Sequence, residues 1–273
     1  MSEPWFSSIK SVILDMDGVL WRGDQQIGVL SDIFSKINKM KLSVVLATNN
    51  STLSAEQYIR KLARYGVNLE LWQVVNSAQA TGHYLERELS TGGPIYIIGE
   101  DGLIKTLNEF GFYHSENRPM AVVVGLDRQI TYEKLRIGTL LVRAGAPLIA
   151  TNPDKTFPAP EGLVPGAGAI IASLEASSGV SAQIIGKPSP EMYRVALGRL
   201  NKNAEETLIV GDRLETDIAG AQAIGCRTAL VLSGVTEKNI AAKWLPKPDI
   251  IASDLDSVLG VLNPKNEFQT KSV

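Results

Sequence analysis

The chain has 273 residues, of which 44% are hydrophobic, so it is long enough to bury one large core or two modest ones. Its 27 basic and 29 acidic side chains give a net charge of -2, which provides no general attraction for nucleic acid or an acidic membrane. The single cysteine, Cys226, excludes an intramolecular disulfide and any zinc site built from several cysteines. We therefore expect a cytoplasmic protein, since no signal peptide or membrane-spanning run of ~20 apolar residues is present.

Short β-branched runs alternate with amphipathic, helix-length segments along the chain. Because these runs are apolar throughout, they predict strands that are covered on both faces, as in a parallel sheet flanked by helices. The pattern therefore predicts an α/β protein with a three-layer, Rossmann-like parallel-sheet core. The runs span residues 11–15, 44–48, 94–99, 120–125, 147–151, 182–186, 207–211 and 227–232.

The most informative polar residues follow predicted strands in two blocks, one before residue ~80 and one after ~180. Between these blocks lies a stretch with its own βα pattern, which predicts a smaller α/β domain inserted into the core. We place the core in residues 1–77 and 183–273 and the inserted domain in 78–182. Within the insertion, the Pro- and Gly-rich residues 152–169 predict an irregular loop.

Two acids, Asp15 and Asp17, leave the first predicted strand on the same side because they are two residues apart. Two carboxylates at this spacing repel each other unless a cation lies between them. Together with Asp212 they form an all-oxygen set that suits Mg²⁺, which binds one or two carboxylates and retains several waters. Gly18 lets the chain turn sharply beside a ligand.

Phosphate-binding groups follow other predicted strands, which we expect to belong to the same sheet. Thr48 and Asn49 offer a hydroxyl and backbone N–H groups next to a helix predicted over residues 54–65, whose N-terminus attracts anions. Lys187 supplies a point charge for an oxygen that becomes negative during a reaction. Asp217 begins a helix-like segment, where it could support the metal or Lys187 from behind.

The four strand exits together resemble the phosphatases of the haloacid dehalogenase superfamily. The resemblance lies in DMDGVLW (15–21), ATNNS (47–51), GKPSPEMY (186–193) and GDRLETDIAGA (211–221). Three further segments look like the NagD-type and 4-nitrophenylphosphatase-like branch, whose C2-type cap domain is inserted after the third core strand. These segments are ATNPD (150–154), PGAGAI (165–170) and LVLSGVT (230–236).

The resemblance implies a specific mechanism. Asp15 would be the nucleophile that forms an aspartyl-phosphate, and Asp17 would be the general acid and then the general base. Mg²⁺ would bind the carboxylates of Asp15 and Asp212 and the backbone carbonyl of Asp17. An aspartate two positions after the nucleophile is typical of the phosphatases and argues against dehalogenation. The residues that would hold the phosphoryl oxygens are Thr48, Asn49 and Lys187.

The sequence leaves several alternatives open. A phosphotransferase or mutase would use the same aspartyl-phosphate, and a phospho-accepting signalling module similar to response-regulator receivers would also combine acids, a Thr and a Lys. The expected partner is a small phosphorylated metabolite, and dimerisation through the cap, known in relatives, leaves a homodimer open. We expect Asn152 and Asp154 to face the substrate from the cap, and Trp21 to pack under the loop that carries Asp15.

Overall fold

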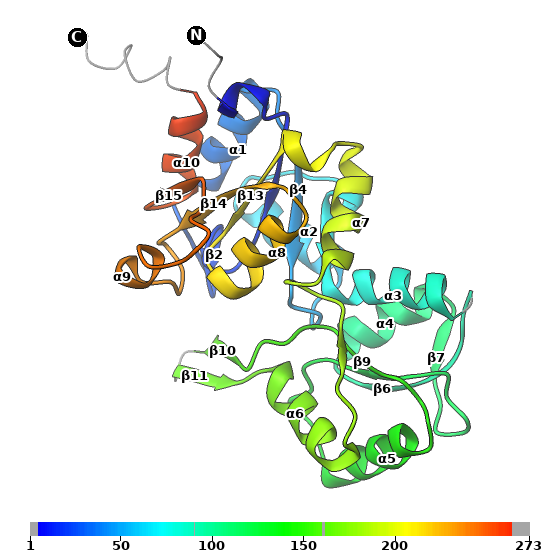
Figure 1. Ribbon diagram of the computed structural model, residues 1–273. Helices are drawn as coiled ribbons and strands as arrows, with labels where there is room; N and C mark the ends of the chain where they lie inside the picture. Colours follow the sequence, from blue (N-terminus) through cyan, green and yellow to red (C-terminus); the bar gives the residue numbers. More distant parts are fainter. Residues whose placement is uncertain (1–4, 90, 160–161, 264–273) are drawn as a thin grey trace, which may run out of the picture. The chain divides into compact units, whose positions relative to one another are not determined.

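The computed structural model describes residues 5–89, 91–159 and 162–263, and the chain divides into two compact units (Figure 1). The first unit consists of Met1–Ala47, Ile59–Val74 and Ala196–Val273, and the second of Thr48–Tyr58 and Val75–Val195. The domain boundaries predicted from the motifs, at residues 77/78 and 182/183, stay a prediction. Among the described residues, no helix is long and apolar enough to cross a membrane.

A parallel six-stranded sheet has the order β15-β14-β13-β1-β4-β5. Every residue of β1 and β13 is buried, which confirms that helices cover both faces of the sheet. The strands are β1 (Ser11–Leu14), β4 (Ser43–Thr48), β5 (Val74–Asn76), β13 (Thr207–Gly211), β14 (Arg227–Val231) and β15 (Ile250–Ala252). A short antiparallel hairpin pairs β2 (Trp21–Arg22) with β3 (Gln25–Gln26).

Connections between parallel strands are right-handed, and this rule decides which face of the sheet each connecting helix covers. The connection from β1 to β4 runs in the opposite direction to that from β13 to β14, so their helices α1 and α8 lie on opposite faces. Helix α10 packs against α1, β14 and β15. The helices and helical turns are η1 (Trp5–Ser8), α1 (Leu30–Lys39), α2 (Ala55–Arg64), η2 (Leu71–Gln73), η3 (Ala204–Glu206), the π-helical turn η4 (Leu214–Ile218), α8 (Ala219–Ala223), α9 (Lys238–Ala241) and α10 (Leu255–Leu262).

A second, five-stranded parallel sheet has the order β12-β9-β8-β6-β7. Its strands are β6 (Gly93–Ile98), β7 (Phe112–His114), β8 (Val122–Val124), β9 (Leu148–Ala150) and β12 (Gln183–Ile184). Side chains of α5 and α6 pack with those of β6, β8 and β9 in one apolar cluster. The helices of the second unit are α3 (Ser77–Glu88), α4 (Asp101–Glu109), α5 (Tyr132–Arg143) and α6 (Ala167–Ser178), and α7 (Pro190–Leu200) is divided between the two units. The predicted α/β fold with a smaller inserted α/β domain is confirmed.

The strand that precedes Lys187 corrects one expectation. We expected it to belong to the same sheet as the strands before Asp15, Thr48 and Asp212, but β12 pairs with β9 in the second sheet. An apolar run of this kind is equally compatible with a strand in either sheet, because both sheets are parallel and covered on both faces. The run therefore predicts a strand correctly and says nothing about its partner.

Residues 152–169 correct a second expectation, since they are not an irregular loop. Strands β10 (Thr156–Ala159) and β11 (Gly162–Pro165) form an antiparallel hairpin in which Phe157 pairs with Val164 (Figure 1). Pro158 and Pro165 are tolerated because each strand of an isolated ribbon has an edge that needs no N–H donor. The prolines therefore hid a strand signal that Phe157, Leu163 and Val164 carry.

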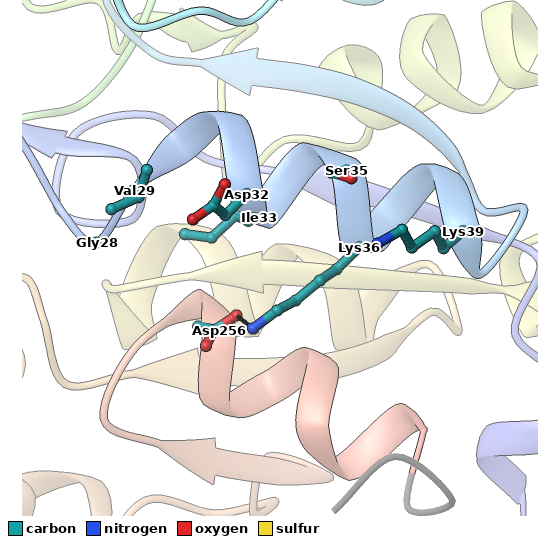
Figure 2. Close-up of a pocket in the computed structure, with 8 residues that line it drawn as sticks. All are labelled: Gly28, Val29, Asp32, Ile33, Ser35, Lys36, Lys39 and Asp256. Atoms are coloured by element: carbon teal, nitrogen blue, oxygen red, sulfur yellow. Dashed lines mark hydrogen bonds and ion pairs between the residues drawn. The ribbon is translucent and has the colours of Figure 1, made fainter. Parts of the chain in front are cut away.

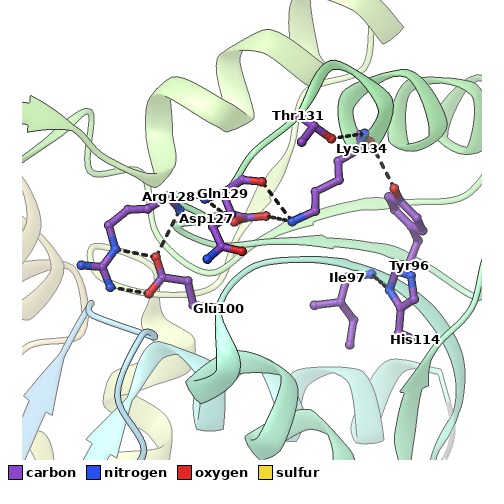
Figure 3. A network of polar contacts seen from close by, with 9 residues as sticks. All are labelled: Tyr96, Ile97, Glu100, His114, Asp127, Arg128, Gln129, Thr131 and Lys134. Carbon is purple, nitrogen blue, oxygen red and sulfur yellow. Dashed lines mark hydrogen bonds and ion pairs between the residues drawn. The ribbon is translucent and has the colours of Figure 1, made fainter.

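Ion pairs fix the loops that follow β6 and β8 (Figure 3). The Arg128 guanidinium donates to both carboxylate oxygens of Glu100, at 2.7 and 2.6 Å, and lowers the pKa of that carboxyl. Asp127 is buried, and it accepts hydrogen bonds from Lys134 Nζ at 2.6 Å and from the backbone of Gln129 at 2.9 Å. These contacts hold the loops at the carboxyl ends of β6 and β8 in place.

Glu191 ties the start of α7 to α3. Its carboxylate accepts hydrogen bonds from the guanidinium groups of Arg87, at 2.7 Å, and of Arg194. Glu191 is buried, and the hydrogen bond from Arg87 is the main cause that lowers the pKa of its carboxyl below the ordinary value of 4.5. The ionised form of Glu191 is therefore the one that stabilises the fold.

We expect Glu191→Gln to destabilise the chain in a pH-dependent way. Since the pKa of Glu191 is lower in the folded than in the unfolded chain, its contribution is complete above pH ~4.5 and is lost as the pH falls through the folded pKa. Urea unfolding at pH 7 should show a wild-type advantage of roughly 1–3 kcal/mol, and this advantage should be smaller at pH 3. The control is Glu109→Gln, whose exposed ion pair should contribute little. An equal loss at both pH values would contradict the assignment.

Candidate active site

Three carboxylates gather at the carboxyl ends of β1 and β13, two neighbouring parallel strands. Asp15 follows β1 and Asp212 follows β13, while Asp217 lies in the turn η4. Their carboxylate oxygens lie within 4.8 Å of one another, and Asp212 and Asp217 are 2% and 1% exposed. Like charges at this distance repel each other, so the cluster is a candidate site for a cation.

The residues around this cluster fit a hard, oxygen-preferring cation. Asp212 is held by the backbone N–H of Val235, which donates to Oδ2 at 2.8 Å, and Asp217 Oδ2 accepts from the backbone of Arg213 at 3.0 Å. Gly18 has φ +86°, and a Cβ there would lie 2.4 Å from Asp212 Oδ2. The expected sharp turn at Gly18 is thus present, and it lets the loop after Asp15 close onto Asp212. Carboxylates and backbone oxygens form the donor set that Mg²⁺ prefers.

Asp17 takes a different position from the other acids. Among the described residues, the acidic group that could hold a metal consists of Asp15, Asp212 and Asp217, so the carboxylate of Asp17 lies apart from it. Asp17 is exposed, and its Oδ1 accepts a hydrogen bond from Trp21 Nε1 at 3.0 Å. Trp21 is buried, as expected for a residue that packs under this loop, and the role of the Asp17 side chain stays a prediction.

The second group of predicted residues lies in the loop after β4 and in the loop after β12. Asn49 Oδ1 accepts from the backbone N–H of Lys187 at 2.8 Å, and Asn49 Nδ2 donates to the backbone carbonyl of Lys187 at 3.0 Å. This paired contact brings together two segments that are far apart in the sequence. Thr48 and Lys187 are each 3% exposed, and Thr48 Oγ1 accepts from the N–H of Asn50 at 3.2 Å.

Asn152 supports the same loop from the second sheet. Its Nδ2 donates to the carbonyl of Asn49 at 2.8 Å, and Ser77 Oγ donates to the same carbonyl at 2.6 Å. Asn152 Oδ1 also accepts from the backbone of Asp154 at 3.1 Å, so the side chain is engaged in holding backbone. The sequence indicated neither Ser77 nor this use of Asn152, because many polar residue types can donate a hydrogen bond to a backbone carbonyl. That Asn152 and Asp154 face the substrate stays a prediction.

A cavity of about 380 Å³ lies elsewhere, beside α1 and α10 (Figure 2). Lys36 reaches from α1 to Asp256 of α10, where Nζ and Oδ1 are 2.5 Å apart, so these two charges are already paired across it. The cavity contains none of the predicted site residues and we do not assign it a function. It is lined by Gly28, Val29, Asp32, Ile33, Ser35, Lys36, Lys39 and Asp256.

Comparisons with known proteins agree with this geometry. A family model described as haloacid dehalogenase-like hydrolase matches residues 12–113, and one described as HAD-hydrolase-like matches residues 184–258. An acid sugar phosphatase from Staphylococcus aureus is 38% identical over 255 residues, which cover 93% of this chain and 98% of the relative. The chain belongs to the haloacid dehalogenase-like hydrolase family. Within this family it is a phosphoric monoester hydrolase of the NagD-like branch, as the motifs predicted.

Solved structures of this family share the fold over almost the whole chain. A 4-nitrophenylphosphatase from Thermotoga maritima has a TM-score of 0.90 at 32% identity and covers 95% of this chain and 100% of its own. NagD from Escherichia coli K-12 has a TM-score of 0.84 at 34% identity, with 90% and 97% covered. A glycerol phosphate phosphatase from Mycobacterium tuberculosis, solved in complex with magnesium, has a TM-score of 0.86 at 32% identity, with 94% and 78% covered.

We expect Asn49→Ala to destabilise this phosphatase fold strongly. The change removes two hydrogen bonds to the backbone of Lys187 and leaves a buried N–H and carbonyl unsatisfied, a loss of roughly 2–4 kcal/mol. The matched control is Asn50→Ala, because the side chain of Asn50 bonds only locally to Thr52 among the described residues. Urea unfolding of both variants tests the assignment, which fails if Asn50→Ala costs as much as Asn49→Ala.

Proposed function

We propose that this phosphatase hydrolyses a small-molecule phosphomonoester through an aspartyl-phosphate on Asp15, with Asp17 as general acid and base. The observation that carries the proposal is the position of Asp15, at the end of β1 and beside the buried carboxylates of Asp212 and Asp217. A carboxylate is a weak nucleophile, and it attacks a dianionic phosphoryl group only where the charge of that group is compensated.

Asp17 suits proton transfer because it is exposed and stands apart from the acidic cluster. In the first step Asp17 gives a proton to the leaving oxygen while the Asp15 carboxylate bonds to phosphorus. In the second step Asp17 accepts a proton from water as the water oxygen attacks phosphorus and releases Asp15. The same group acts as acid and then as base, so it returns to its starting state after each cycle.

Thr48, Asn49 and Lys187 are proposed to hold the phosphoryl oxygens, through a hydroxyl, backbone N–H groups and an ammonium. The side chain of Asn49 is occupied by the backbone of Lys187. We therefore assign to Asn49 a contact through its backbone N–H and a second role in fixing Lys187. Donors that are held rigidly before the reaction stabilise the charge that develops in the transition state most effectively.

Mg²⁺ is the proposed cofactor, held by the carboxylates of Asp15 and Asp212 and the backbone carbonyl of Asp17, with Asp217 as a supporting acid. When bound, the ion compensates the charges of the phosphoryl group and of the carboxylates around it. Two observations support the choice: the donor set of this chain, and the magnesium with which the Mycobacterium tuberculosis phosphatase was solved in complex.

A small polar phosphomonoester, such as the phosphate of a sugar or polyol, is the proposed substrate class. The names of two similar proteins, an acid sugar phosphatase and a glycerol phosphate phosphatase, support this class. Substrate specificity belongs to the cap and its loops, and therefore varies among relatives that share one fold.

We expect Asp15→Asn to abolish phosphate release from 4-nitrophenyl phosphate, with a loss of roughly 10³-fold or more, because the amide is not a nucleophile. The variant should stay folded, and Asp256→Asn, an exposed acid on α10, should keep wild-type activity. Product analysis with an added sugar as acceptor distinguishes hydrolysis from phosphotransfer. Substantial turnover by Asp15→Asn would contradict the proposed nucleophile.

Removal of divalent cations is expected to abolish activity, and Mg²⁺ should restore it. Because a bound cation relieves the repulsion among three clustered carboxylates, Mg²⁺ should also raise the unfolding temperature, and Asp212→Asn should reduce that rise. Scanning calorimetry with chelator and with Mg²⁺ measures the effect independently of turnover. An enzyme that stays fully active in chelator would contradict the metal assignment.

A further inference from the structure

Trp21 makes a hydrogen bond that the proposed reaction does not yet explain. Its indole N–H donates to Oδ1 of Asp17 over 3.0 Å. The two side chains differ sharply in exposure, because Trp21 is 1% exposed whereas Asp17 is an exposed residue. A buried donor therefore restricts the orientation of an exposed carboxylate.

The backbone between the two residues is equally fixed. The N–H of Gly18 donates to the carbonyl of Trp21 at 2.7 Å, and the N–H of Leu20 donates to the carbonyl of Met16 at 2.8 Å. Ser233 Oγ donates to the carbonyl of Gly18 at 2.7 Å, which ties this loop to the segment after β14. Trp21 and Asp17 thus belong to one loop that these hydrogen bonds hold closed.

Groups on and after α2 hold the indole from outside. Lys61 Nζ lies 4.4 Å from the centroid of the Trp21 ring and donates to the carbonyl of Gly23 at 2.7 Å. Tyr65 packs beside the ring, with a centroid distance of 6.2 Å, and its hydroxyl donates to the carbonyl of Asp24 at 2.7 Å. A cation over the ring attracts its π electrons, which makes the indole N–H a stronger donor.

We propose that Trp21 is a positioning residue for Asp17, which it orients for proton transfer to and from the substrate. This inference rests on the proposed function and adds the group that aims its general acid. With Oδ1 held by the indole, Oδ2 carries the proton that passes to the leaving oxygen as the bond from that oxygen to phosphorus breaks. Trp21 neither gains nor loses a proton, and it acts by orienting the carboxyl group of Asp17.

The alternative is that Trp21 only packs in the core. A positioning role requires the indole N–H, whereas a packing role does not. Trp21→Phe keeps an aromatic side chain and removes the donor. An alkyl phosphate needs a proton on its leaving oxygen, whereas 4-nitrophenolate leaves well without one. Asp17 also serves the second step, which is the same for both substrates, so the comparison is made on leaving-group release in a single turnover. In that step a misdirected acid should slow the alkyl substrate selectively, and a packing defect should slow both substrates alike.

The test compares KM and the single-turnover rate of leaving-group release for wild type and Trp21→Phe on glycerol phosphate and on 4-nitrophenyl phosphate. General acids contribute about 10²–10⁴-fold, so we expect the single-turnover rate to fall at least about tenfold for the alkyl substrate and less than about threefold for the aryl one, with KM unchanged. Trp244→Phe is the matched control, since the indole N–H of Trp244 is buried without a hydrogen-bond partner in the described part of the chain. Trp244→Phe should leave the ratio of the two single-turnover rates unchanged.

Two further variants make the outcome decisive. In an Asp17→Ala background, Trp21→Phe should cause no additional loss of kcat, because a positioning residue has nothing left to position. If Trp21→Phe does not fold, an isosteric analogue with sulfur in place of the indole N–H is incorporated at residue 21 and measured in the same way. Equal losses on both substrates, or full additivity with Asp17→Ala, would overturn the inference. A wild-type enzyme that releases no phosphate from either compound would instead overturn the proposed function.

Discussion

The crowding of acids at the ends of two neighbouring strands is the constraint on which the site depends. Parallel pairing of β1 with β13 sets Leu14 opposite Val210, so the residues that follow each strand, Asp15 and Asp212, emerge at the same edge. With Asp217 their carboxylate oxygens lie within 4.8 Å. Like charges held this close repel each other, and functional sites often trade stability for chemistry in this way. The turn at Gly18 and the hydrogen bonds to Asp212 maintain the crowding.

Hydrogen bonds to backbone hold the second group of predicted residues, which lies in the second unit. Asn49 joins the loop after β4 to the loop after β12 through both ends of its amide, and Asn152 and Ser77 hold the carbonyl of Asn49. A buried amide with all of these groups satisfied fixes one arrangement of Lys187, since any shift would leave polar atoms unpaired. The backbone of Lys187 is thus held by a neighbour whose own side chain is fully engaged in doing so.

Sequence patterns predicted the strands well because uninterrupted β-branched runs have few other uses in a chain of this composition. They also predicted the acids and Lys187 as site residues, because each follows a strand. They could not assign residues 183–184 to a sheet, since a short apolar run carries no information about its partner, and the prolines of residues 152–169 hid a hairpin. The hydrogen bond from Trp21 to Asp17 could not be predicted either, because an aromatic residue after a strand is equally typical of simple packing.

The central claim is that Asp15 becomes covalently phosphorylated, and trapping the intermediate tests it most directly. Asp17→Asn should slow the second step, so mixing this variant with a phosphomonoester that has a good leaving group and quenching in acid should preserve the phosphorylated enzyme. Peptide mass spectrometry should then locate the phosphoryl group on Asp15. Phosphorylation of another residue, or turnover of the wild-type enzyme with no phosphoryl-enzyme at any quench time, would contradict the account.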